Sequence, residues 1–254
     1  MTLFELKGQV AIVTGGNGGI GLGMARGLAQ AGARLVVAAR NKDKGRAAVE
    51  ELEGLGTEAR FCSVDVSDEA SVAAMVRTTV DAFGGVDILV NNAGTNIRKQ
   101  PQEYALAEWR RVLDTTLTSA FLCSKAVYTL MKKAGRGKII NIGSMMSIFG
   151  ASFAAPYAAS KGGIVQLTKA MATAWAKDHI QVNAVLPGWI DTDLTAQARK
   201  QIPGLHERVI ARTPEGRWGV GNDLAGLAVF FASPASDFIT GTAIPVDGGY
   251  SIQG

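Results

Sequence analysis

The sequence lacks the features that would place it in several large classes of protein. It has only two cysteines, Cys62 and Cys123, which sit in apolar surroundings without C-x-x-C spacing and therefore predict buried free thiols, with no disulfide and no metal site. Its two histidines also lack metal-ligand spacing. No apolar run approaches the roughly 18 residues of a membrane helix, and the first residues do not resemble a signal peptide. These absences favour a cytoplasmic protein without a membrane partner.

Charge is also sparse. Only 19% of the 254 residues are charged, the net charge is +4, and no basic run of five or more occurs, so we expect no nucleic-acid partner. The small positive excess suits an anionic cofactor or small-molecule substrate. Hydrophobic residues make up 47% of the chain and glycines number 31, which is typical of an α/β domain with many tight turns.

Short apolar runs alternate with amphipathic segments along the whole chain. The apolar runs predict seven strands, at residues 10–13, 34–38, 59–64, 86–90, 138–142, 180–186 and 243–246. Helical spacing occurs between them, near 20–31, 42–54, 68–83, 103–133, 155–178 and 222–232. This alternation predicts one Rossmann-type domain over residues 1–254, a doubly wound seven-stranded parallel sheet with helices on both faces. The least regular stretch, about 190–219, is expected to be a substrate loop or lid.

A glycine-rich loop follows the first predicted strand. It reads Thr14-Gly15-Gly16-Asn17-Gly18-Gly19-Ile20-Gly21 and leads directly into a predicted helix. Glycines allow close approach of the backbone, and the free N–H groups and dipole of the helix attract a pyrophosphate. A glycine cluster also fits a purely structural turn, but its place after the first strand favours dinucleotide binding.

The end of the second strand bears on the choice of cofactor. An acid there would bind the free ribose hydroxyls of NAD, whereas an arginine accommodates the 2′-phosphate of NADP. The sequence has Arg40 and nearby Lys42 and no acid, which favours NADP, with NAD possible. Gly18 occupies a loop position where a basic residue would have strengthened this interpretation. The alternative is that Arg40 is only a solvated surface charge.

Tyr157 and Lys161 are four residues apart and lie on one face if the segment is helical. An adjacent ammonium lowers the pKa of a tyrosine. Shifting that pKa from about 10 to about 7 requires roughly 4 kcal/mol in favour of the phenolate. The spacing alone also fits a packed tyrosine beside a solvated lysine, so the meaning of the pair depends on the other motifs.

Taken together, the motifs resemble the short-chain dehydrogenase/reductase family. They occur in family order across the chain: T-G-x-x-x-G-I-G from Thr14 to Gly21, Asp65-Val66, Asn91-Asn92-Ala93-Gly94, Ser144, Tyr157-x-x-x-Lys161, Pro187-Gly188-Trp-Ile190-Asp-Thr192 and Val246-Asp247-Gly248-Gly249. The resemblance implies that Tyr157 is the general acid/base, that Lys161 holds the nicotinamide ribose and lowers the tyrosine pKa, and that Ser144 binds the substrate oxygen.

The same resemblance implies a set of cofactor contacts. Asp65 would contact the adenine, Asn91 and Gly94 the ribose region, and Ile190 with Thr192 the carboxamide. The full set implied is Thr14, Gly15, Asn17, Gly19, Ile20, Gly21, Arg40, Asp65, Val66, Asn91, Ala93, Gly94, Tyr157, Lys161, Pro187, Gly188, Ile190 and Thr192.

Thr116 departs from the family pattern, which usually has asparagine at this position in a proton relay to the lysine. Threonine offers one hydroxyl in place of an amide. We keep Thr116 among the candidate catalytic residues. Three interpretations stay open, namely a working variant relay, a weakened enzyme and an engineered substitution.

The expected substrate is a sugar, polyol or sugar acid. Residues 96–99 together with Met145, Met146, Ser147, Trp189, His206, Arg212 and Trp218 could line a pocket that resembles those of gluconate and deoxygluconate dehydrogenases. Arg98 or Arg212 would then pair with a substrate carboxylate, although either could equally be a surface charge. His206 is more often a loop residue than a base.

Two other functions remain open at this point, a reductase of 3-oxoacyl thioesters or other ketones, and a cofactor-binding protein without turnover. The family resemblance also implies a homotetramer, formed through the helices predicted at 103–133 and 155–178 and through the C-terminal strand.

Overall fold

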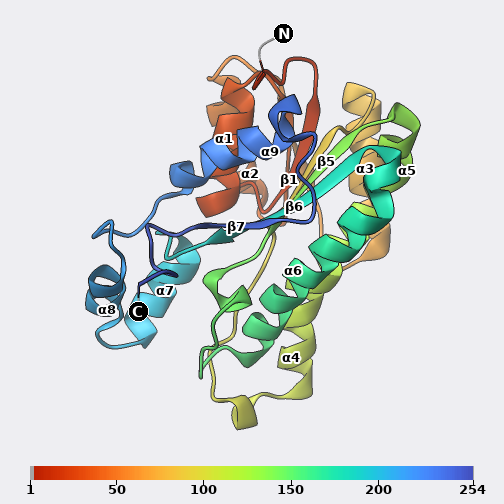
Figure 1. Cartoon of the computed structure of the whole chain (residues 1–254). Coiled ribbons are helices and arrows are strands. Elements are labelled where there is room, and N and C mark those ends of the chain that lie inside the picture. Colours follow the sequence, from red (N-terminus) through yellow and green to blue (C-terminus); the bar gives the residue numbers. More distant parts are fainter. Residues whose placement is uncertain (1–2, 254) are drawn as a thin grey trace.

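Seven parallel strands form one sheet in the computed structural model, which describes residues 3–253 (Figure 1). They are β1 (Val10–Thr14), β2 (Arg34–Ala39), β3 (Ala59–Ser63), β4 (Ile88–Asn91), β5 (Gly137–Ile142), β6 (Ile180–Pro187) and β7 (Ala243–Val246). Their order across the sheet is β3-β2-β1-β4-β5-β6-β7. The direction of winding therefore reverses between β1 and β4, which confirms the doubly wound topology predicted from the sequence.

The side chains of alternate residues in the central strands pack into two separate hydrophobic cores, one on each face of the sheet. In β1, Ala11 and Val13 belong to the core on one face of the sheet, and Val10 and Ile12 to the core on the other. Because successive side chains of a strand point to opposite faces, a strand covered on both faces is apolar throughout. This is why the strands appear in the sequence as continuous apolar runs rather than as alternating patterns.

Helices cover both faces of the sheet (Figure 1). One core is closed by α1 (Gly19–Gln30), α2 (Lys42–Glu53) and α9 (Ala225–Ala232), and the other by α3 (Glu69–Phe83), α5 (Ser119–Ala134) and α6 (Ala155–Trp175). Asn41 and Asp68 cap the starts of α2 and α3 with their side-chain oxygens. α3 ends on Gly84, whose left-handed backbone (φ 85°) stops the helix.

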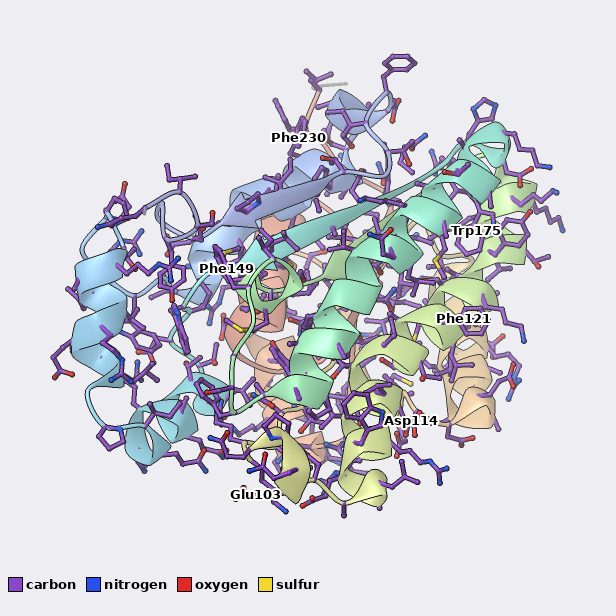
Figure 2. The ribbon with its side chains drawn as sticks, turned by 60° about the horizontal axis from the view of Figure 1, so that its bottom comes forward. Glu103, Asp114, Phe121, Phe149, Trp175 and Phe230 are labelled. Carbon is purple, nitrogen blue, oxygen red and sulfur yellow. The ribbon has the colours of Figure 1, made fainter. Side chains whose placement is uncertain are left out.

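The long helix predicted at 103–133 is divided in the structure. A short 3₁₀ turn (Pro101–Glu103) precedes α4 (Leu106–Leu113), and a π-helical segment (Asp114–Thr118) separates α4 from α5. Asp114 marks the start of this wider turn in Figure 2. Sequence periodicity does not reveal such a segment, because one extra residue in a single turn barely changes the apolar pattern.

The segment 190–219, expected to be irregular, contains two helices, α7 (Asp193–Gln201) and α8 (Leu205–Arg212). Pro203 and Gly204 lie between them and mark a turn. Ala198, Leu205, Val209 and Trp218 form a small core of their own, separate from the two cores of the sheet. Helices of nine and eight residues have too few turns to give a clear apolar period, so the sequence did not predict them.

Two further properties bear on the expectations drawn from the sequence. Within residues 3–253, no helix is long and apolar enough to span a bilayer. Cys123 is a buried free thiol, as predicted, whereas the free thiol Cys62 is only half-buried.

Candidate active site

A cavity of about 1210 Å³ opens where the strands end at their carboxyl termini. The segments that follow β1 to β6 all contribute to its walls. Ligands of open α/β sheets bind at this edge, next to the point where the winding reverses. The volume exceeds the roughly 300–1,000 Å³ of ordinary small-molecule pockets, so a dinucleotide and a substrate can share it.

The glycine loop forms one end of the cavity. Gly15 and Gly19 have left-handed backbones (φ 63° and 52°), and both line the cavity together with Asn17 and Ile20. The first turn of α1 contains no acid, and no side chain caps it. Its N–H groups and the positive end of the helix dipole therefore fit an anionic group of a bound cofactor, which is the arrangement that a pyrophosphate requires.

Two residues of the predicted cofactor set hold this loop from behind the cavity wall. The Thr14 hydroxyl donates to the Val90 carbonyl and accepts from the backbone N–H groups of Asn92 and Ala93. A Cβ on Gly21 would lie 2.4 Å from the Gly15 carbonyl oxygen, so only glycine allows this turn. Neither Thr14 nor Gly21 lines the cavity in the described part of the chain.

Asn91 is likewise buried, and its amide donates to Ser124 (2.9 Å) and to the Asn141 side-chain oxygen (2.8 Å). Among the described residues, its neighbour Asn92 reaches the cavity instead and donates to the carbonyls of Thr14 and Gly15. The sequence could not separate the two asparagines, because only the direction of the last residue of β4 decides which one faces the core.

The rest of the predicted cofactor set lines the cavity. Arg40 and the pair Asp65-Val66 form the wall after β2 and β3. Hydrogen bonds from Ser67 hold the pKa of Asp65 below its usual value, and the charge of Arg40 adds to this effect. The members on the remaining walls are Ala93, Gly94, Tyr157, Lys161, Pro187, Gly188, Ile190 and Thr192.

One cation of this wall was missed in the sequence. Lys44 lines the cavity, whereas Lys42 is absent from the lining among the described residues. Lys44 also pairs with Asp193 across the opening (2.6 Å). The signal was available, because Asn41 caps α2 and places Lys44, three residues further on, on the same side of the helix start.

Ser144, Tyr157 and Lys161 meet on the wall after β5. Ser144 follows β5, while Tyr157 and Lys161 lie on α6 and share one helix face, as predicted. The Lys161 ammonium nitrogen lies 5.5 Å from the centre of the Tyr157 ring and donates to the Ile142 carbonyl (2.6 Å). The Ser144 hydroxyl oxygen accepts from the Met146 backbone N–H (3.1 Å).

Burial dominates the titration of this group. It raises the pKa of Tyr157, while a hydrogen bond with Ser144 and the charge of Arg98 act in the opposite direction. It also lowers the pKa of Lys161 to about 7, since that side chain is almost fully buried. The charge of Arg98, which the sequence placed in the substrate pocket, therefore also favours the Tyr157 phenolate.

Part of the predicted substrate pocket assembles around these residues. Asn96, Arg98, Met145, Met146 and Trp189 line the cavity. Arg98 is half-buried and donates to the Leu194 carbonyl and to Gln201 on α7. The sequence missed Arg111 and Phe153, which also line the cavity, because α4 and the segment before α6 approach it only in the folded chain.

The other predicted pocket residues lie elsewhere. The Arg212 guanidinium sits over the rings of Phe149 and Tyr250, and His206 stacks on Trp218. Lys99 pairs with Glu108. Within the described residues, none of Ile97, Lys99, Ser147, His206, Arg212 and Trp218 lines the cavity, so the expectation that they do was wrong.

Thr116 lies in the π-helical segment and is almost fully buried. Its hydroxyl accepts from the Thr95 backbone N–H (3.4 Å) and faces the Thr95 carbonyl (3.5 Å). Among the residues described, it is not part of the cavity lining. Its contacts therefore connect it to the segment that carries Arg98.

The chain is similar to known proteins over almost its whole length. A family model described as enoyl-(acyl carrier protein) reductase matches residues 15–251. The chain is 44% identical to 2-dehydro-3-deoxy-D-gluconate 5-dehydrogenase of Formosa agariphila, over 97% of this chain and 94% of that protein. It is 38% identical to gluconate 5-dehydrogenase of Gluconobacter oxydans, over 99% of this chain and 98% of that protein.

A solved structure gives the same result. Gluconate 5-dehydrogenase of Burkholderia cenocepacia, crystallised with NADP and tartrate, superposes with a TM-score of 0.94 at 38% identity, covering 99% of this chain and 98% of that one. Together with the motifs and the cavity that they line, these matches show that the chain belongs to the short-chain dehydrogenase/reductase family, as an NAD(P)-dependent oxidoreductase acting on CH–OH groups.

Proposed function

We propose that the protein is an NADP-preferring dehydrogenase that interconverts a secondary alcohol and a ketone of a sugar acid. The observation that carries the proposal is that Arg98 lines the same cavity as Ser144, Tyr157 and Lys161. A cation beside an acid/base group is what a substrate with both a carboxylate and a reactive hydroxyl requires. The similar proteins named above act on such compounds.

In alcohol oxidation, Tyr157 is the general base and Ser144 orients the reacting oxygen. The Tyr157 phenolate takes the hydroxyl proton and returns it in the reverse direction. A bound nicotinamide cofactor would supply the other half of the reaction, the acceptance or donation of a hydride. Lys161 would hold the ribose of the bound nicotinamide and, when protonated, would favour the phenolate.

Arg40 supports the preference for NADP. It lines the cavity next to the end of β2, where no acidic side chain occurs to bind the free ribose hydroxyls of NAD. Three of the similar solved structures contain NADP, among them the Burkholderia enzyme. NAD remains a slower alternative in this proposal.

The substrate carboxylate is assigned to Arg98 rather than to Arg212. Arg98 is half-buried on the cavity wall, so its charge is less screened than that of a surface arginine. Tartrate, present in the Burkholderia structure, is itself a hydroxy acid. An anion with neighbouring hydroxyl groups is the chemistry that this wall would recognise.

The segment 190–219 would act as a substrate lid on a single domain spanning residues 1–254. It carries α7, which Arg98 and Lys44 both contact from the opposite side of the opening. A homotetramer in the cytoplasm completes the proposal. The exposed Phe121 on α5 (Figure 2) and Leu106 on α4 are apolar surface suited to self-association, and the two free thiols fit a reducing compartment.

The test is the absorbance of the reduced nicotinamide, measured with NADP or NAD against gluconate, 2-dehydro-3-deoxygluconate, neutral sugars, polyols and 3-oxoacyl thioesters. We expect the highest kcat/KM for a sugar acid with NADP. A neutral polyol or an oxoacyl thioester as the best substrate would refute the substrate assignment, and equal use of NAD would refute the cofactor assignment.

A further inference from the structure

Lys44 and Asp193 connect two elements on opposite sides of the cavity opening. Lys44 lies in the first turn of α2, Asp193 is the first residue of α7, and the Lys44 ammonium nitrogen is 2.6 Å from an Asp193 carboxylate oxygen. Both line the cavity. Thr192, next to Asp193, approaches the glycine loop so closely that a Cβ on Gly19 would lie 2.9 Å from its methyl group. The ion pair therefore spans the cofactor end of the cavity.

This ion pair is easily broken. The Lys44 side chain is 59% exposed and that of Asp193 is 86% exposed, and pairs this accessible contribute little to stability. A phosphate monoester carries more negative charge than a carboxylate and has three acceptor oxygens. If such a group enters the opening, it is the stronger partner for the lysine ammonium.

The surroundings of Lys44 suit a phosphate. Arg40 lines the same wall, and the N-terminus of α2 directs its positive dipole end to this side. Asp43 and Glu50 on α2 do not belong to the cavity lining among the described residues, and Glu51, which does, is already engaged by Arg26. The Asn41 side chain accepts from the Lys44 backbone N–H (2.9 Å), which fixes the position from which the lysine extends.

We propose that Lys44 binds the 2′-phosphate of NADP beside Arg40, and that Asp193 competes with this phosphate for the lysine. Lys44 is thus a residue that discriminates NADP from NAD, and Asp193 weakens that discrimination. The inference rests on the proposed preference for NADP, because it assigns a second cation to the group that distinguishes the two cofactors.

The test is calorimetric binding of adenosine 2′,5′-bisphosphate and of adenosine 5′-monophosphate, which differ only in the 2′-phosphate. We expect Lys44→Ala to weaken binding of the bisphosphate by about five- to tenfold and Asp193→Asn to strengthen its binding by about two- to fivefold. Neither change should affect the monophosphate. In the Lys44→Ala background, Asp193→Asn should have no effect, because the lysine for which the acid competes is gone.

Several outcomes would overturn the inference. If Asp193→Asn strengthens binding equally with and without Lys44, the acid repels the phosphate directly and does not compete for the lysine. If Arg40→Ala weakens binding of the bisphosphate but Lys44→Ala does not, the preference for NADP is supported and the role proposed for Lys44 is refuted. If the wild type binds both probes equally, the preference for NADP fails as well. Both side chains are exposed, so unchanged melting temperatures of the free variants will show that the fold is intact.

Discussion

The ammonium nitrogen of Lys161 lies 2.6 Å from the carbonyl oxygen of Ile142, the last residue of β5. This hydrogen bond to the sheet fixes the position of the Lys161 ammonium group, and Lys161 lies one helix turn from Tyr157 on α6. The side chain is almost fully buried and its pKa is lowered to about 7. A buried cation held by one carbonyl is costly to the fold, so its presence at the site indicates a functional demand.

Replacing Lys161 with methionine should therefore stabilise the protein near neutral pH while abolishing activity. The pKa of lysine is about 10.5 in the unfolded chain, whereas that of Lys161 in the folded protein is about 7. Between these two pH values the unfolded state binds more protons than the folded state, so the free energy of unfolding decreases as the pH falls through this range. We expect Lys161→Met to raise the free energy of unfolding by roughly 1–3 kcal/mol at pH 7 and by little near pH 10.5, measured by urea denaturation. Lys125→Met, at an exposed position on α5, serves as the control. Equal gains at both pH values would contradict the explanation.

Tyr157→Phe removes the hydroxyl that we assign to proton transfer and leaves the ring in place. We expect kcat to fall by at least about 100-fold, since general acid–base catalysis contributes on this scale. Binding of NADP, followed by calorimetry, should change far less because the phosphate-binding end of the cavity is untouched. Tyr250→Phe is the matched control, because Tyr250 packs on Arg212 outside the described cavity lining. A loss of only a few fold in Tyr157→Phe would exclude it as the acid/base.

The fold and most of the cavity could be predicted because they depend on local pattern. Strands such as β1 are apolar on both sides, and the glycine loop, Ser144 and Tyr157 each follow a strand or lie on a helix start. Their meeting at one edge is a consequence of parallel strands. The order of the motifs in the sequence therefore predicted which of them lie together in the folded protein.

What could not be predicted depends on contacts between distant segments. Arg98 and Arg212 look alike in the sequence, yet one lines the cavity and the other sits over two aromatic rings. Likewise, α7 and α8 pack around their own small core with Trp218. No periodic pattern of apolar residues in the sequence indicates this core. The pKa of Lys161 follows from its burial, which only the packed structure shows.

The preference for NADP can be tested at Arg40. Arg40→Ala should lower kcat/KM with NADP by about tenfold, equivalent to roughly 1.4 kcal/mol, because a charge-assisted hydrogen bond to the 2′-phosphate is lost. The value with NAD should stay within about twofold of the wild type, as NAD has no such phosphate. Lys42→Ala is the control, since Lys42 lies outside the cavity lining in the part of the chain described. Equal losses with both cofactors would show that Arg40 acts on the fold or on binding in general.

Arg98 offers a test of the substrate class. Arg98→Ala should raise KM for a sugar acid by at least about tenfold by removing the partner of the carboxylate. It should leave KM for an uncharged polyol nearly unchanged, whereas the same change at Arg212 should affect neither. Arg98 also donates to the Leu194 carbonyl on α7, so a general loss of lid position is the competing explanation. That explanation predicts that Arg98→Ala raises KM equally for the sugar acid and for the polyol. It also predicts that Arg98→Lys, which keeps the charge, does not selectively restore KM for the sugar acid.

Thr116 is best understood through Thr95, whose backbone N–H donates to its hydroxyl and whose carbonyl lies 3.5 Å from it. Thr116→Val keeps the shape but leaves both backbone groups without this partner, so we expect a loss of about 1 kcal/mol in unfolding free energy. Because Thr95 leads into the segment with Arg98, KM for a sugar acid should rise more than kcat falls. Thr116→Asn, which retains both a donor and an acceptor, should recover much of the loss. If Thr116 instead relays protons to Lys161, Thr116→Val will shift the pH–rate profile and lower kcat at unchanged KM, and that result would contradict the positioning role.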